Sequence, residues 1–259
     1  MDWTGETLSN GVREREFRLV CEGRTVPGVL WLPEHAHGTR PLVLLGHGGG
    51  LHKRAPYITG LARRLVRHHG IAAVAIDGPD HGARRPDGGL DFDKVWAERL
   101  QRRANPKPGL TDEMVADWKA TLDAVQSQGG CGEGPVGYWG LSMGTIYGLP
   151  FVAAEPRVQV AVLGLMGIAP APTTDPWLAL TQERLGGDVG RVTCPVLFLT
   201  QSDDELVPRD HALCLFDALG TKDRRLHLNP GAHSAVPVEE IDHSEAFLAR
   251  HLLPGTPGA

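Results

Sequence analysis

The chain has 259 residues, of which 41% are hydrophobic and 22% are charged. These values are typical of a soluble globular protein and exclude collagen-like and low-complexity chains. The net charge of −5 argues against a basic surface that would bind nucleic acid or an anionic membrane, so we expect neither partner. No apolar run reaches the roughly 18 residues that a membrane-spanning helix needs.

The cysteines and the N-terminal residues indicate the cellular compartment of the protein. The four cysteines are far apart and form no C-x-x-C pair, which favours reduced thiols over a disulfide framework. Residues 1–17 mix acidic and basic side chains without an apolar core, so we expect neither a secretory signal nor a transit peptide. We therefore expect a cytoplasmic protein, folded as a single domain over residues 1–259.

Short apolar runs along the chain predict the strands of an α/β fold. Residues 14–20 and 25–32 alternate in polarity around Glu22-Gly23 and predict a β-hairpin. The runs that follow are almost wholly apolar, as in parallel strands covered on both faces. They comprise residues 41–45, 71–76, 136–139, 158–163 and 196–199, followed by a short strand at 226–228. We expect a mostly parallel sheet of about eight strands with helices on both faces.

Helical periodicity fills most of the intervals between these strands. The predicted helices cover residues 56–69, 111–128, 208–219 and 237–252, together with a helix that begins after residue 142. Thr111 is the predicted cap of the second of these helices. Two connections, residues 82–110 and 165–193, are longer than the fold requires, and we expect them to form pocket walls. The tail after Leu253 is expected to fray.

The pentapeptide Gly140-Leu141-Ser142-Met143-Gly144 matches the pattern G-x-S-x-G. It follows the predicted strand 136–139 and opens a helix, which is the context that a nucleophilic serine requires. A serine on so tight a turn has a strained backbone, and the flanking residues approach neighbouring chain closely. Glycine is the residue that fits there. Ser142 is therefore the candidate nucleophile.

A serine hydroxyl needs a base and an orienting acid, and both follow later in the chain. Asp204 comes after the strand 196–199, with Asp203 and Glu205 as rival acids, and His233 lies in a loop ahead of the last helix. In parallel sheets, ligand-binding and catalytic residues lie at the carboxyl ends of the strands. The order serine, acid, histidine is the one that the α/β-hydrolase fold uses.

From about Phe17 to Leu252 the chain resembles the small bacterial α/β-hydrolases of the dienelactone-hydrolase-like and esterase/peptidase branch. The resemblance implies an α/β-hydrolase fold with a minimal cap. In that family the acid belongs to a segment like D-x-x-V-P, which residues 204–208 match. Residues 46–50 resemble the HGGG oxyanion loop, which implies one amide donor from Gly48 or Gly49 and the other from Met143. Residues 77–82 resemble D-x-P-x-H-G and are interpreted as structural support.

Other motifs do not indicate a cofactor or a metal. The G-x-G-x-x-G of residues 132–137 leads into a strand rather than a helix, so it is not a dinucleotide fingerprint. There is no G-K-[ST] and no zinc motif, and His68-His69 lacks a third ligand in the sequence. We therefore predict neither a cofactor nor a metal site.

These features together predict a serine hydrolase that acts on small carboxylic esters through an acyl-enzyme intermediate. Dienelactone hydrolases proper use cysteine as the nucleophile, so the serine here argues against dienelactone as the substrate. Two alternatives stay open from the sequence: a serine peptidase or amidase of the same fold, and a non-catalytic binding protein. The oligomeric state is undetermined by the sequence.

Overall fold

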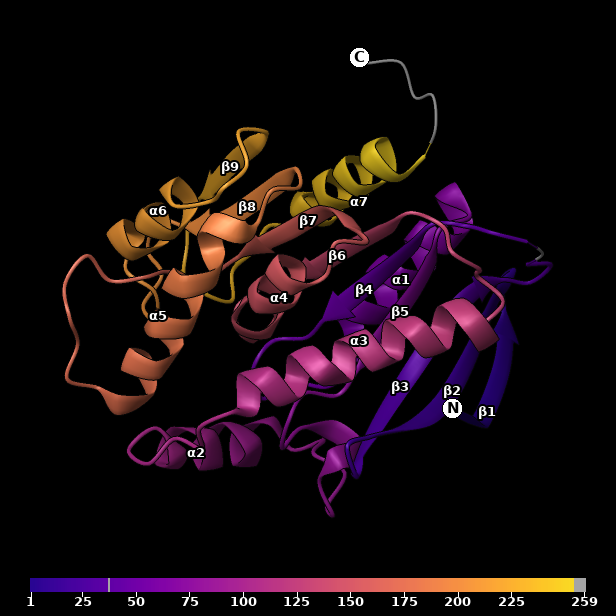
Figure 1. The fold of residues 1–259 in the computed structure, drawn as a ribbon, viewed down its shortest axis with the longest axis horizontal. Helices are drawn as coiled ribbons and strands as arrows, with labels where there is room; N and C mark the ends of the chain where they lie inside the picture. Colours follow the sequence, from indigo (N-terminus) through magenta and orange to yellow (C-terminus); the bar gives the residue numbers. More distant parts are fainter. Residues whose placement is uncertain (37, 254–259) are drawn as a thin grey trace.

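The computed structural model describes residues 1–36 and 38–253, so the expected fraying of the tail concerns residues outside the described part. Within these described residues, one mixed sheet of nine strands has the order β1-β2-β3-β5-β4-β6-β7-β8-β9 (Figure 1). The strands are β1 Asp2–Ser9, β2 Val12–Cys21, β3 Arg24–Pro33, β4 Leu42–Gly46, β5 Ala72–Ile76, β6 Val136–Gly140, β7 Val158–Gly164, β8 Val196–Gln201 and β9 Arg224–Asn229.

The N-terminal strands are antiparallel and form one side of the sheet. β2 and β3 pair across Glu22-Gly23, whose φ angles of 48° and 79° suit a tight hairpin, so this prediction is confirmed. Strand β1 was not predicted. Nearly all of its residues are exposed because it is the sheet's edge strand, so it lacks an apolar alternation that sequence analysis could detect.

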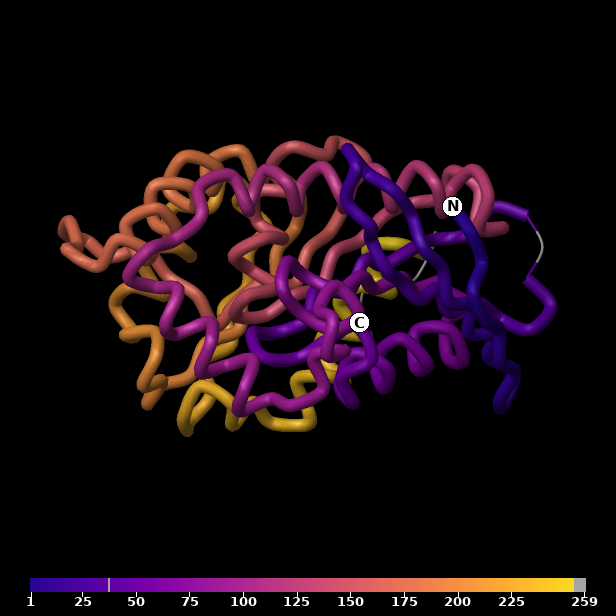
Figure 2. Tube along the Cα trace, turned by 90° about the horizontal axis from the view of Figure 1, so that it is seen from below, coloured from indigo at the N-terminus to yellow at the C-terminus, as the bar shows by residue number. Residues whose placement is uncertain are grey.

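From β5 to β9 the neighbouring strands are parallel, which confirms the predicted α/β architecture. Strands β4, β5 and β6 are buried throughout, as their apolar sequences predicted. Helices cover both faces: α1 and α7 lie on one side of the sheet and α3 on the other (Figure 2). The helices are α1 Pro56–His69, α2 Phe92–Arg102, α3 Leu110–Gln128, α4 Met143–Ala154, α5 Pro176–Asp188, α6 Arg209–Asp217 and α7 Glu239–Leu252.

Two of these helices, α2 and α5, lie inside the connections 82–110 and 165–193, where the sequence predicts pocket walls. Asp91 caps α2 by accepting a hydrogen bond from the Lys94 amide, and Asp175 caps α5 through the Leu178 amide. Both helices carry few buried residues. The apolar periodicity of α5 is weak, whereas in α2 Phe92, Val95, Trp96 and Leu100 recur at helical spacing, a signal that the sequence did contain. The predicted capping role of Thr111 is wrong, because α3 begins one residue earlier and its N-cap is Gly109.

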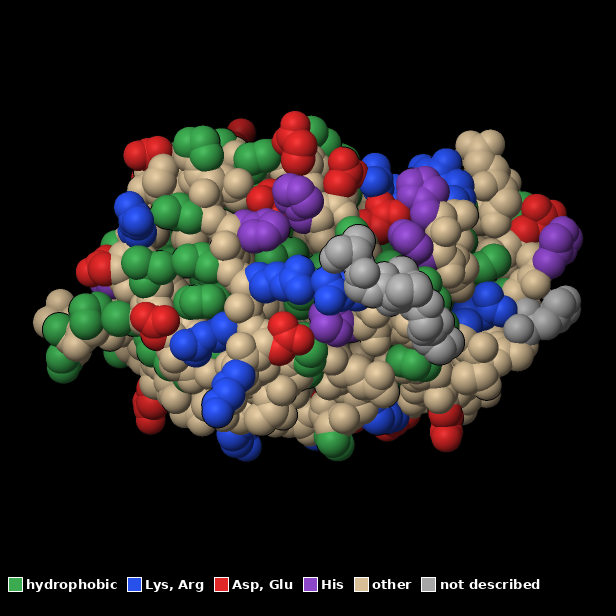
Figure 3. All heavy atoms as spheres, turned by 90° about the horizontal axis from the view of Figure 1, so that it is seen from above, with side chains coloured by type: hydrophobic (Ala, Val, Ile, Leu, Met, Phe, Trp, Pro, Cys, Tyr) green, Lys and Arg blue, Asp and Glu red, His purple; other side chains and the backbone are tan. Residues whose placement is uncertain are grey.

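Among the described residues, no helix combines the length and the apolar character that crossing a bilayer demands. Basic and acidic side chains are interspersed on the face shown in Figure 3 rather than separated into large patches of one sign.

Candidate active site

Ser142 lies on a strained turn between β6 and α4. Its backbone angles, φ 56° and ψ −117°, are unusual for a residue with a side chain. A Cβ atom on Gly144 would lie 2.6 Å from the carbonyl oxygen of Gly46, and one on Gly140 would lie 2.9 Å from the Gly144 backbone. The close approach that the G-x-S-x-G pattern predicted is therefore present at both glycines.

Buried polar side chains hold this turn in place. Thr145 Oγ1 lies 2.6 Å from the Gly164 carbonyl oxygen and accepts a hydrogen bond from the Gly164 amide at 2.8 Å. The Ser142 amide donates to the same Gly164 carbonyl at 2.9 Å. Tyr138 donates its hydroxyl proton to the Gly144 carbonyl at 2.8 Å. Sequence reasoning missed Thr145 and Tyr138, because nothing in the motif itself marks the residues that support it.

The structure brings Ser142, Asp204 and His233 together. His233 Nε2 lies 2.9 Å from Ser142 Oγ, and His233 Nδ1 lies 2.8 Å from Asp204 Oδ2. The Asp204 side chain is 1% exposed and that of His233 is 13% exposed. One imidazole therefore joins a hydroxyl and a buried carboxylate, the arrangement in which a histidine acts as a base.

The two rival acids contact other groups. Asp203 accepts hydrogen bonds from the Ser202 hydroxyl at 2.8 Å and from the Gly231 amide at 3.1 Å. Glu205 accepts one from the backbone amide of His233 at 2.9 Å, so it holds the loop rather than the imidazole. Of the three neighbouring acids, Asp204 is the one that meets the His233 ring.

The surroundings of Asp204 keep it ionised. Burial alone would raise its pKa, but the hydrogen bonds from His233 and from the Leu206 and Val207 amides outweigh burial, so its pKa is lowered. A carboxylate held in this way keeps His233 Nδ1 protonated and leaves Nε2 free to accept a proton.

The glycine-rich loop after β4 supplies candidate oxyanion donors. The Gly48 amide already donates to the Tyr57 hydroxyl at 2.7 Å, and burial raises the pKa of that tyrosine to about 12, which keeps it neutral. Across the described residues, the amides of Gly49 and Met143 make no hydrogen bond. Met143 is the first residue of α4, where amides have no acceptor within the helix. The geometry therefore favours Gly49 over Gly48 as the partner of Met143.

A buried pair of histidines links this loop to the segment after β5. His47 Nε2 accepts a hydrogen bond from the Gly78 amide at 2.9 Å, and His81 Nε2 accepts one from the Gly50 amide at 3.0 Å. Each Nδ1 faces a backbone carbonyl oxygen, at 2.9 Å for His47 and 2.7 Å for His81. Burial is the main cause that lowers the pKa of His47 to about 4 and that of His81 to about 3. Both rings are therefore neutral and act as rigid connectors.

Asp77 anchors the same segment, in agreement with its interpretation as structural support. Its Oδ2 atom lies 2.6 Å from Lys53 Nζ and accepts from the Ala83 amide at 2.8 Å, while Oδ1 accepts from the Lys53 amide at 2.9 Å. A Cβ atom on Gly82 would lie 2.2 Å from Asp77 Oδ1, so a glycine is required there. In the described part of the chain, Asp77 makes no hydrogen bond or ion pair with Ser142.

A cavity of about 440 Å³ lies beside the site. Its lining comes mainly from residues 79–81, from 95–112, from α5 and from Ile146 and Tyr147 of α4. Ser142 and His233 are not in this lining. The cavity adjoins them through Arg99, whose Nη1 lies 2.8 Å from Met143 Sδ, and through Ile146, whose amide donates to the Ser142 carbonyl at 3.0 Å.

Two groups of histidine and glutamate among the described residues have ligand atoms within 4.8 Å of one another, and both lie outside the site described above. In the first, Glu245 supplies the third ligand that His68-His69 lacks in the sequence. Its Oε2 atom, however, is paired with Arg64, whose positive charge opposes a metal cation. The second comprises His227, Glu240 and His243. Neither group touches Ser142, Asp204 or His233.

The fold and this site can be compared with solved structures. The polyethylene glycol-bound complex of a cold-adapted esterase from an Arctic intertidal metagenomic library is 44% identical, with a TM-score of 0.81. The alignment covers 98% of this chain and 100% of that one. The chain belongs to the esterase branch of the α/β-hydrolase superfamily.

More distant structures share the fold of this α/β-hydrolase. Acetyl xylan esterase 1 from Thermoanaerobacterium sp. JW/SL YS485 is 15% identical with a TM-score of 0.74, over 97% of this chain and 88% of that one. Est1E from Butyrivibrio proteoclasticus is also 15% identical, with a TM-score of 0.64 over 91% of this chain and 96% of that one. No protein-family profile and no curated sequence matched this α/β-hydrolase.

Proposed function

We propose that this α/β-hydrolase is a serine esterase that cleaves small carboxylic esters with Ser142, His233 and Asp204. The observation that carries the proposal is the single imidazole of His233, which lies 2.9 Å from Ser142 Oγ and 2.8 Å from Asp204 Oδ2. The relative that is 44% identical is described as an esterase, which supports the choice of esters as substrates.

The first step transfers the acyl group to the serine. His233 Nε2 accepts the proton of Ser142 as Oγ attacks the ester carbonyl carbon, and Asp204 orients and stabilises the imidazolium. The amides of Gly49 and Met143 donate to the oxygen on which negative charge develops. Removing one such donor typically costs about 3 kcal/mol of transition-state stabilisation. The imidazolium then gives its proton to the departing alcohol.

The second step is hydrolysis of the acyl-enzyme. A water molecule loses its proton to His233 Nε2 and attacks the acyl carbon, the same two amides hold the oxyanion, and Ser142 leaves with the proton returned by the imidazolium. The products are the carboxylic acid and the free serine.

The proposal treats residues 1–259 as one catalytic domain in which the segments 82–110 and 165–193 form the walls of the substrate pocket. Its support is that both segments contribute to the lining of the cavity beside Met143. The wide spacing of the four cysteines supports a cytoplasmic location, which is part of the same proposal.

A fluorophosphonate probe tests the nucleophile directly. The wild type should be labelled, whereas Ser142→Ala should not, and equal labelling of both would remove Ser142 from its role. His233→Ala should also abolish labelling while leaving the unfolding transition in place. A panel of 4-nitrophenyl esters of graded chain length, run beside an aminoacyl 4-nitroanilide, then separates an esterase from a peptidase of the same fold.

A further inference from the structure

The cavity beside the site contains a positive charge that no carboxylate of the described residues neutralises. Arg99 of α2 lines this cavity and forms no ion pair with any carboxylate in the described residues. Its hydrogen-bonding contact is with the neutral thioether of Met143, at 2.8 Å from Nη1 to Sδ. Buried or half-buried guanidinium groups are normally paired, so an isolated one at a cavity wall calls for an explanation.

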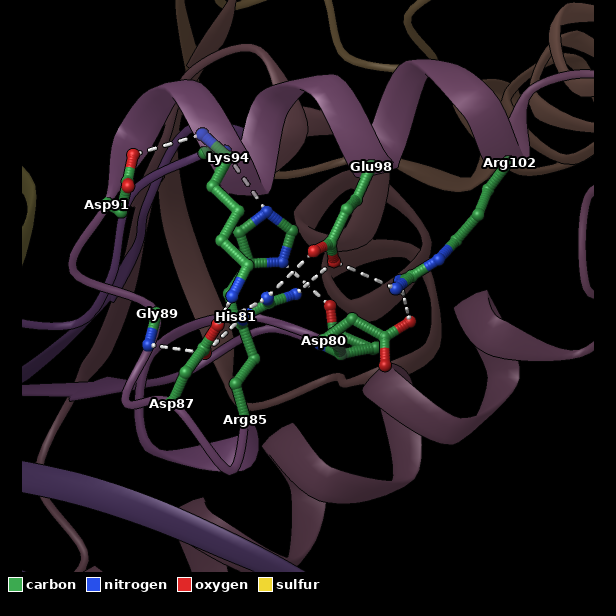
Figure 4. Close-up of polar contacts among 11 residues, drawn as sticks. Asp80, His81, Arg85, Asp87, Gly89, Asp91, Lys94, Glu98 and Arg102 are labelled. Atoms are coloured by element: carbon green, nitrogen blue, oxygen red, sulfur yellow. Dashed lines mark hydrogen bonds and ion pairs between the residues drawn. The ribbon is translucent and has the colours of Figure 1, made fainter.

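The other cations of the lining all have acidic partners. Arg102 pairs with Asp80 at 2.7 Å, and Figure 4 shows these two side chains directed toward one another. Lys107 pairs with Glu113 at 3.0 Å. Arg184 pairs with Asp112 at 2.6 Å and with Asp188 at 2.7 Å.

Among the residues that the structure describes, no carboxylate pairs with Arg99. Arg103, one turn further along the chain, pairs with Asp175 at 2.9 Å. The acid of the lining that has no ion pair is Glu183, which is exposed and does not contact Arg99. Arg99 is thus the cation of the cavity wall that is left without a carboxylate.

Arg99 lies against both candidate oxyanion donors. Besides its contact with Met143, its Cζ atom would be 3.3 Å from a Cβ atom built on Gly49. The face of the Trp177 ring lies on another side, with its centroid 5.5 Å from Arg99 Cζ. A substrate whose ester carbonyl meets the Gly49 and Met143 amides would therefore bring a nearby substituent into contact with this guanidinium.

The electrostatics agree with this geometry. Burial lowers the pKa of Arg99, Tyr147 partly offsets this effect, and the positive charge of Arg103 adds to the lowering. The guanidinium is thus held where its charge is disfavoured, and an anion placed beside it would be favoured. A planar guanidinium with five donors matches a carboxylate in particular, because it can form two parallel hydrogen bonds.

We infer that Arg99 forms an anion subsite and that the preferred substrates are esters carrying a carboxylate group close to the scissile bond. This inference rests on the proposed esterase function and narrows its substrate class. The carboxylate can belong to the acyl part, as in a half-ester of a dicarboxylic acid, or to the alcohol part, and the same guanidinium chemistry would recognise either.

Paired substrates that differ in charge test the subsite. On the acyl side, 4-nitrophenyl hydrogen glutarate is compared with 4-nitrophenyl pentanoate. On the alcohol side, 4-acetoxybenzoate is compared with 4-acetoxybenzamide. The measured quantity is the ratio of kcat/KM for the anionic ester to kcat/KM for its neutral partner. Arg99→Gln should lower this ratio by about 10- to 100-fold on at least one side, the range expected from losing hydrogen bonds to a charged group.

Two further variants separate the subsite from a general loss of charge. Arg102→Gln removes a cation from the same cavity wall, but one that already has Asp80 as a partner, so the ratio should stay close to that of the wild type. Arg99→Lys keeps the positive charge, so it should lower the ratio of kcat/KM values less than Arg99→Gln does. A ratio that falls equally in Arg99→Gln and Arg102→Gln, or equally in the glutamine and lysine variants of Arg99, would overturn the inference.

The wild type alone gives an independent result if Arg99→Gln does not fold. A tenfold preference of the wild type for the neutral ester on both sides would overturn the subsite while leaving the esterase proposal intact. If Arg99 instead stabilised the oxyanion, its replacement would slow both esters of a pair equally and the ratio would not change, which also overturns the subsite. Failure of the esterase proposal itself would show as undiminished turnover by Ser142→Ala.

Discussion

Acid should destabilise this protein through His47 and His81, the two buried histidines that connect the glycine-rich loop of residues 46–50 to the segment after β5. In the folded state the pKa of His47 is lowered to about 4 and that of His81 to about 3, with burial as the main cause. In the unfolded chain both are expected near 6.5. Because the folded values are the lower ones, the unfolded state binds protons below pH 6.5 that the native state does not, so stability falls as the pH is lowered toward 4.

The magnitude follows from the unfolded value. At pH 5 an unfolded histidine with a pKa of about 6.5 gains about 2 kcal/mol by protonation, while a folded one that stays neutral gains almost nothing. Protonation of His47 and His81 in the unfolded state should therefore lower the free energy of unfolding by about 4 kcal/mol between pH 7 and pH 5. Most aspartates and glutamates remain ionised above pH 5, so this window reports mainly on histidines.

Urea unfolding at pH 7, 6 and 5 measures this loss. His47→Gln and His81→Gln should each be less stable than the wild type at pH 7, because a glutamine side chain does not reproduce the spacing of the two ring nitrogens that contact a buried amide and a carbonyl oxygen. Between pH 7 and pH 5, the free energy of unfolding of each variant should also fall by about 2 kcal/mol less than that of the wild type. His35→Gln is the matched control, since that side chain is 86% exposed. If the loss is the same in the wild type and in both buried variants, the reasoning is refuted.

Three substitutions near the site give further tests. Asp204→Asn should lower kcat by about 10⁴-fold because the imidazole loses the carboxylate acceptor that fixes its tautomer, whereas Asp203→Asn should lower kcat far less. Steady-state kinetics on one ester measures both effects, and the reverse ranking would identify Asp203 as the acid. Tyr57→Phe leaves the Gly48 amide without its acceptor and should cost about 1–3 kcal/mol of stability in urea, so an unchanged midpoint would contradict the assigned contact. Gly144→Ala places a methyl group against the Gly46 carbonyl and should lower the free energy of unfolding by about 3 kcal/mol, measured by the same urea unfolding. A variant of wild-type stability would contradict this prediction and show that the turn can relax.

The parts of the fold that could be predicted are those where local sequence and burial agree. Strands β4, β5 and β6 are covered on both faces, so their apolar runs were sufficient evidence. Helix α5 shows the opposite case, because its cap Asp175 is present in the sequence but its apolar periodicity is weak. Helix α2 was predictable, since Phe92, Val95, Trp96 and Leu100 recur at helical spacing after the cap Asp91.

The residues of the candidate site also differ in whether the sequence could predict them. Ser142 could be proposed from its motif, Asp204 from a strand end and a segment that resembles the family's, and His233 from its place in the loop ahead of the last helix. The choice between Gly48 and Gly49 could not be made, since it depends on the Tyr57 hydroxyl, which reaches the loop from α1. Contacts that join separate elements have no local signature, and they are found only when the chain is folded.

Arg99 shows why this matters for specificity. In the sequence it is one of several arginines in the connection of residues 82–110, and no motif marks it. In the structure its neighbours Arg102 and Arg103 each pair with an acid near the surface. Arg103 also lies over the Trp177 ring and Arg102 lines the same cavity, so Arg99 differs from them in its hydrogen-bonding partner, which is the Met143 thioether and not a carboxylate. Charge composition cannot distinguish these three residues, since the distinction lies in the partner that is missing. A substrate anion is the partner that this arrangement selects.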